Sequence, residues 1–226
     1  MCVFELESSL RVVFSSTVVF VNKFYPSHSS MAKLHPTIAI SDAFLAGISL
    51  LVAIKMLRGG SYPPGFPFGL ILTATAAGLG VLRFGFSPDV IHMHQSMFCL
   101  VITLGVPFIM LNLAASSLPQ FERLLESMLS TKLVLLVAFI GAVVLVSSQR
   151  NQKLTEQAGT IVLVGSVVVA LVCSVWHWNS TSLAIVAIYM LTGLLGGDVD
   201  GELLGVGNVN WLHYLLCVAN TLLLYV

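Results

Sequence analysis

Long apolar stretches separated by short polar breaks dominate the chain from residue 36 onward. Six of them are apolar enough, and nearly long enough, to cross a bilayer as helices: Pro36 to Met56, Phe66 to Phe86, Asp89 to Ala115, Lys132 to Val146, Gly159 to Trp178 and Ser182 to Gly196. A seventh stretch, Val209 to Val226, is interrupted by Asn210, His213 and Asn220. Helices satisfy their backbone hydrogen bonds internally, as lipid requires. The pattern predicts an all-α polytopic transmembrane bundle of six to seven short spans.

The first 34 residues do not follow this pattern. Their apolar run, Val12 to Val21, is too short to cross a hydrocarbon core about 30 Å thick. They also lack the basic start and the small-residue cleavage site of a secretory signal. We therefore expect a peripheral or disordered arm over residues 1–34 and a single transmembrane domain over residues 35–226. Translation is expected to start at either Met1 or Met31, since the first span follows Met31 at once.

The connections between spans are short and rich in helix-breaking residues. They read GGSYPPG after the first span, FSPD after the second and GGDVDGELLGVGN before the last. In FSPD, Ser87 is placed to cap the third helix and Pro88 to occupy its first position.

The one long connection has a helical pattern of its own. Leu118, Phe121 and Leu125 recur at helical spacing, while Glu122 and Glu126 take the other face. We expect an amphipathic helix at about residues 117–130, lying in the headgroup plane. The alternative is an ordinary solvated linker.

Small residues recur along the second span, where Ala74 and Gly78 form one row and Ala76 and Gly80 another. Lipid provides no hydrophobic drive between helices, so close approach at small residues is what packs them. These rows predict helix-packing seams. We find no internal repeat between the first three spans and the next three, so the inverted-repeat architecture of many transporters is not supported.

Composition narrows the class of protein further. Hydrophobic residues make up 57% of the 226 residues and charged residues only 9%, with a formal net charge of zero. An average soluble domain is about a quarter charged, so an ordinary soluble globule is excluded. The absence of a basic excess also argues against a nucleic-acid partner. The four cysteines are scattered singly, without the spacing of a disulfide framework or a metal site.

Ionisable residues within apolar spans are the candidates for chemistry, because lipid makes them costly. Asp42, His92, His94 and His213 all fall on one side of a seven-span topology, beside an acidic loop with Asp198, Asp200 and Glu202. His92 and His94 are about 200° apart on a helix and cannot both face one metal. Asp42, His92 and His213 are therefore candidate catalytic residues. The competing interpretation, which we favour, is that these groups are structural or are solvated near helix ends, with no metal and no cofactor.

Three runs of this sequence resemble a known family of membrane proteins. The runs AFLAGISLLVAIKM, GFPFGLILTATAAGLGV and IHMHQSMFCLVITLGVPFIMLNL resemble the first half of the vertebrate transmembrane protein 276 family in order, spacing and small-residue placement. The similarity continues through WHWNSTSLAIVAIYMLTGLLG and covers roughly residues 38 to 220. It implies a small multi-pass membrane protein without an established activity. It carries over no functional residues, and the arm before Met31 is a departure from it.

We therefore expect a structural or interaction component of a membrane complex rather than an enzyme. Its partners would be the lipid bilayer and another membrane protein or a second copy of the chain, and an endomembrane location is favoured. Two alternatives stay open. One is a small-solute transporter with a helix broken at Gly105-Val106-Pro107, and the other is a metal-dependent lipid hydrolase using Asp42, His92 and His213. Zinc hydrolases of the polytopic alkaline-ceramidase type carry a histidine pair four apart in the last span, where this chain has His213 and Cys217.

The first testable prediction concerns topology. The nine basic residues flanking the seven spans divide five to four in favour of a cytoplasmic N-terminus. The two termini should then lie on opposite sides of the membrane, with the loop of residues 198–208 on the cytoplasmic side. Tags at both termini, probed with protease in sealed vesicles, measure this. Two termini on the same side would exclude seven spans.

Overall fold

The computed structural model describes residues 34–118, 140–141, 143–144, 146–147, 150–195 and 201–226. Its helices are α2 (Pro36–Gly59), α3 (Gly65–Gly85), α4 (Ile91–Leu100), α5 (Val106–Ser117), α8 (Gln152–Trp176), α9 (Ser180–Leu195) and α10 (Asn208–Leu222). The arm over residues 1–33, the expected interfacial helix beyond Leu118, most of the Lys132 to Val146 stretch, and Asp198 and Asp200 lie outside the described residues.

Four helical segments are long and apolar enough to cross a membrane: Pro36–Gly59, Gly65–Gly85, Pro88–Ser117 and Gln157–Trp176. The predicted helical class is thereby confirmed, and four of the predicted spans are helices with the length and composition to cross a membrane. The count of six to seven exceeds what length and composition support in the described residues. The physical reason is length, since α9 with 16 residues covers about 24 Å and α10 with 15 residues about 22 Å, at about 1.5 Å per residue.

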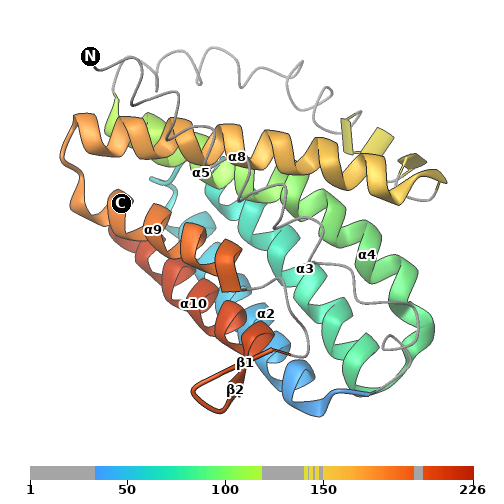
Figure 1. Ribbon diagram of the computed structural model, residues 1–226. Helices are drawn as coiled ribbons and strands as arrows, with labels where there is room; N and C mark the ends of the chain where they lie inside the picture. Colours follow the sequence, from blue (N-terminus) through green and yellow to red (C-terminus); the bar gives the residue numbers. More distant parts are fainter. Residues whose placement is uncertain (1–33, 119–139, 142, 145, 148–149, 196–200) are drawn as a thin grey trace.

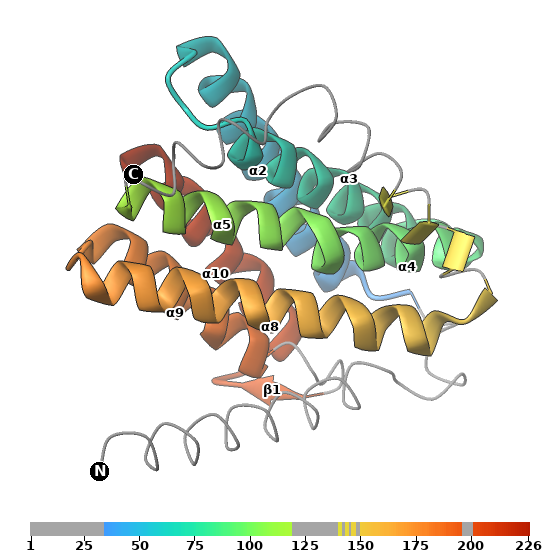
Figure 2. The ribbon, with the colours of Figure 1, turned by 90° about the horizontal axis from the view of Figure 1, so that it is seen from above.

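The helices form a bundle with two distinct ends (Figures 1 and 2). At one end α2 begins and α3 finishes, and the amide of His35 donates to the carbonyl of Phe84 at 2.9 Å. We call this the hairpin end, because the β-hairpin before α10 lies there. At the opposite end, the C-terminal end, the hydroxyl of Tyr62 in the α2–α3 turn donates to the carbonyl of Leu224 at 3.1 Å. α10 therefore runs alongside α2 for most of its length.

The described residues include one two-stranded sheet, a β-hairpin before α10. Strands β1 (Glu202–Leu203) and β2 (Val206–Gly207) pair in antiparallel register, with Leu203 opposite Val206. The two residues between them, Leu204 and Gly205, both have positive φ, at 56° and 74°. Two left-handed residues form the type I′ turn that matches the twist of a two-residue hairpin.

The third predicted span is one continuous helical stretch from Pro88 to Ser117 with a π-helical segment at Val101–Gly105. Pro107 has no backbone N–H, and its ring conflicts with the carbonyl four residues earlier. The wider π turn just before Pro107 accommodates both effects. The start of the stretch matches only half of the prediction, since Pro88 occupies the first position but Ser87 makes no capping bond to the backbone.

Two glycines of α3 that the sequence places in packing seams differ sharply in the structure. A Cβ on Gly80 would clash with the carboxylate of Asp42 on α2, and would lie 2.7 Å from its Cγ. A Cβ on Gly78 would meet nothing within 4 Å. The seam predicted at Gly80 is therefore confirmed, whereas the described residues show no contact at Gly78, about 200° away on the helix.

This difference generates a matched pair of variants. Gly80→Ala should destabilise the folded protein by about 1–3 kcal/mol, because the methyl group overpacks the contact with Asp42. Gly78→Ala should be neutral or raise stability by up to about 1 kcal/mol, because alanine favours helix and the space is open. Thermal unfolding of the purified variants in one detergent measures both. Equal destabilisation by the two substitutions would contradict the packing described.

Candidate functional site

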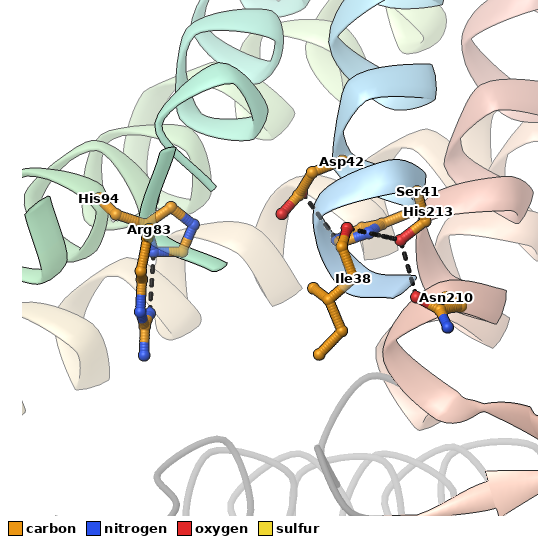
Figure 3. A network of polar contacts seen from close by, with 7 residues as sticks. All are labelled: Ile38, Ser41, Asp42, Arg83, His94, Asn210 and His213. Atoms are coloured by element: carbon orange, nitrogen blue, oxygen red, sulfur yellow. Dashed lines mark hydrogen bonds and ion pairs between the residues drawn. The ribbon is translucent and has the colours of Figure 1, made fainter. Parts of the chain in front are cut away.

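The candidate site lies at the hairpin end, where α2 meets α10. Ser41 and Asp42 on α2 are 0% and 3% exposed, and Asn210 and His213 on α10 are 9% and 8% exposed. Asn210 and His213 are three residues apart and therefore lie on one face of α10. Both faces turn inward, so that four polar side chains meet between two helices rather than in water (Figure 3).

His213 is the centre of this group. Its Nε2 lies 3.3 Å from Oδ1 of Asp42, and its Nδ1 lies 2.8 Å from Oγ of Ser41. Oγ of Ser41 also lies 2.8 Å from Oδ1 of Asn210 and 3.0 Å from the carbonyl of Ile38. The two ring nitrogens of His213 are thus both engaged, one with each of two neighbouring residues of α2.

One pattern of donors satisfies the whole chain of contacts. If Nδ1–H of His213 donates to Oγ of Ser41, then the hydroxyl of Ser41 donates to Oδ1 of Asn210. A single proton between Nε2 of His213 and Oδ1 of Asp42 completes the pattern. The result is an unbroken chain from Asn210 through Ser41 and His213 to Asp42.

A second pair extends the site toward α3 and α4. A guanidinium nitrogen of Arg83 donates to Nδ1 of His94 at 3.0 Å, which places the ring proton of a neutral His94 on Nε2 because arginine has no acceptor. Arg83 is close enough to Asp42 to interact with it electrostatically. Within the described part of the chain, Oδ2 of Asp42 and Nε of Arg83 are both buried without a hydrogen-bond partner. Figure 3 shows the free oxygen of Asp42 on the side of Arg83 and His94.

The three candidate catalytic residues do not converge. Asp42 and His213 are in contact, but His92 is exposed on the outer face of α4, and Glu202 is exposed in the hairpin. The idea that these groups are solvated near helix ends holds for His92 and is wrong for Asp42 and His213, which Gly80 and α10 cover. No group of three His, Cys, Asp or Glu side chains within the described ranges could hold a metal ion.

Ser41, His213 and Asp42 have the connectivity of a nucleophile, a base and a residue that orients the base. Ser41 is nevertheless 0% exposed, and its hydroxyl points into the contact with α10. It also lies inside a regular helix, whose amides are already used in backbone hydrogen bonds and cannot stabilise an oxyanion. The arrangement therefore joins helices and does not present a nucleophile.

A second buried network lies nearer the C-terminal end. The hydroxyl of Tyr189 on α9 donates to Oδ1 of Asn220 on α10 at 2.8 Å, and the amide of Asn220 donates to Oγ of Ser49 on α2 at 2.9 Å. The sequence marks Asn220 only as an interruption of an apolar stretch. Ser41, Ser49 and Tyr189 carry no signal in the sequence, because apolar helices tolerate single hydroxyl groups at any position.

No family model, no curated protein and no solved structure matches this chain. Its function is therefore argued from the site and the fold.

The site generates a prediction about coupling between α2 and α10. Ser41→Ala and Asn210→Ala should each destabilise the protein, and the double variant should lose about 0.5–2 kcal/mol less than the two single losses combined. Ser166→Ala is a matched control, because Ser166 is also buried but donates only to the carbonyl of Leu163 in its own helix. Chemical unfolding in detergent measures all of these variants. Additive losses for Ser41 and Asn210 would show that the two side chains are not coupled.

Proposed function

We propose that the chain is a multi-pass integral membrane protein of six to seven spans that serves as a structural or interaction component of a membrane complex. One observation carries this proposal. The ionisable groups that lipid would otherwise make costly, Asp42 and His213, are buried and engaged in a contact between helices. Such a site holds a bundle together, and its own reactive groups, on Ser41, Asp42 and His213, are buried.

The positions of the helix ends support the number of spans. α5 finishes at the C-terminal end, and α8 begins on the side of α4, at the hairpin end (Figure 2). The described residues between 140 and 147 are helical, and Val144 packs with Cys99 and Leu104. On this basis, and with α9 and α10 included, we propose seven passes; the start of α2 and the C-terminus lie at opposite ends (Figure 1).

The outer surface of α8 supports an interaction role. Only 22% of the span Gln157–Trp176 is buried, against 67% of the span Pro88–Ser117. Ile161 and Val172 of α8 are 63% and 57% exposed. A helix this apolar and this open needs a cover of lipid or of another transmembrane helix. We further propose membership in the transmembrane protein 276 family, an endomembrane location and a cytoplasmic N-terminus.

A small-solute transporter is the second candidate, and one feature favours it. The π-helical segment at Val101–Gly105 lies at the position where the sequence suggests a broken helix, and π-helical turns are frequent at functional sites. The metal-dependent hydrolase is less well supported, since His92 lies away from Asp42 and His213.

Photocrosslinking from α8 tests the interaction role. A photoreactive residue in place of Val172, which is 57% exposed, should give one discrete protein adduct in native membranes. The same residue in place of Ala170, which is 0% exposed, should give none.

Lipid adducts alone at Val172 and at Ile161 would count against a partner on this face. Solute uptake by reconstituted vesicles would instead favour the transporter. Near-stoichiometric zinc in the purified protein, lost in the His213→Ala variant, would instead favour the hydrolase.

A further inference from the structure

Three large aromatic side chains stand out from the C-terminal end of the bundle. Trp176 is 78% exposed, Trp178 is 84% exposed and Tyr225 is 73% exposed. Trp176 is the last residue of α8, Trp178 lies in the turn before α9, and Tyr225 lies in the 3-10 turn that follows α10. Figures 1 and 2 both show the C-terminus beside the connection from α8 to α9, so that these side chains belong to one end.

The turn that carries Trp178 is held in place by hydrogen bonds. The amide of Trp178 donates to the carbonyl of Val175 at 3.2 Å, and the amide of Asn179 donates to Ser174 at 3.1 Å. The side chain of Asn179 in turn accepts from the amide of Ser182 at 3.1 Å, at the start of α9. Trp178 itself has a left-handed φ of 52°, a conformation that a bulky residue adopts only where the surroundings impose it. The indole is therefore directed outward by a defined turn.

The placement of acidic side chains distinguishes this end from the hairpin end. Lys55 and Arg58, both exposed, lie in the last turns of α2. The carboxylates of Asp42, Asp89 and Glu202 lie at or near the hairpin end, with the starts of α2, α4 and α10. Within the described ranges, the C-terminal end therefore combines exposed aromatic rings with basic side chains, and the Asp and Glu side chains named above lie away from it.

We propose that Trp176, Trp178 and Tyr225, with Lys55 and Arg58, form an anchor that binds the lipid headgroup layer. This inference rests on the proposed integral membrane protein. Exposed Val172 and Val175 lie in the last turn of α8 before Trp176, so the apolar surface of α8 ends where the indoles begin. An indole or phenol ring fits that boundary, because its body is apolar while its N–H or O–H donates to phosphate and ester oxygens. The two cations extend toward the phosphates.

The anchor fixes the depth of the candidate site. α2 has 24 residues and is therefore about 36 Å long, slightly more than the hydrocarbon core. Asp42 lies six residues after Pro36, about 9 Å along the axis from the start of α2. With the C-terminal end at one headgroup layer, the contact between Asp42 and His213 lies in the opposite leaflet.

The three tryptophans of the chain provide the experiment, because the third, Trp211, lies at the hairpin end with its indole N–H donating to the carbonyl of Leu203 at 2.8 Å. The Trp211→Phe variant keeps only Trp176 and Trp178, so its tryptophan emission comes from the anchor. The double variant Trp176→Phe, Trp178→Phe keeps only Trp211, so its emission comes from the hairpin end. Each full-length variant is reconstituted into phosphatidylcholine vesicles whose lipids are brominated either near the headgroup or near the chain terminus.

The Trp211→Phe variant should lose more emission with bromine near the headgroup than with bromine near the chain terminus. Stronger quenching by the deep bromine would overturn the anchor, and so would no lipid quenching together with full quenching by aqueous iodide. In sealed vesicles of uniform orientation, external iodide should quench the tryptophan emission of only one of the two variants, because the two ends face opposite sides of the membrane. Extraction of the membranes with alkaline carbonate distinguishes the anchor from the proposed integral membrane protein. A protein that resists extraction but fails these tests loses only the anchor, whereas a protein that is extracted is not an integral membrane protein.

Discussion

Burial of the Asp42 carboxylate among apolar helices is the constraint on which the arrangement of the hairpin end depends. Taking such a group out of water is unfavourable unless it gains a polar partner, and lipid supplies none. His213 provides the partner at 3.3 Å, which holds α10 against the first turns of α2. Gly80 leaves room for the same carboxylate, which lets α3 approach from the other side. The side chain of Asp42 thereby fixes the positions of α2, α3 and α10 relative to one another.

The same reasoning explains how α10 is held. This helix has 15 residues and carries three polar interruptions, features that would weaken an isolated span. Asn210 and His213 contact Ser41 near its start, and Asn220 contacts Ser49 and Tyr189 further along. Two contact points along one axis define both the register and the rotation of α10 against α2. Hydrogen bonds are suited to this task, because apolar side chains in lipid have little preference among neighbours.

The two ends of the bundle differ in chemistry. Asp42 and His213 lie at the hairpin end and are turned inward, whereas Trp176, Trp178, Tyr225, Lys55 and Arg58 lie at the C-terminal end and are exposed. Between the ends, the core consists of close apolar contacts such as those of Met56, Phe66 and Ile109. This division is the one a bilayer imposes, since polar groups in the interior need internal partners and amphipathic groups are favoured at the interface.

The sequence alone determined the class of the protein, four of the spans and the turns at helix-breaking residues, because apolar length and glycine or proline chemistry act locally. It also identified Asp42 and His213 as candidates, since charge within an apolar stretch is visible in one dimension. Only the tertiary structure decided that these two residues meet, that Ser41 and Asn210 join them, and that His92 is exposed. These outcomes depend on the rotation of each helix about its axis, which is decided by contacts between residues such as Ser41 and His213 that are 172 positions apart in the chain.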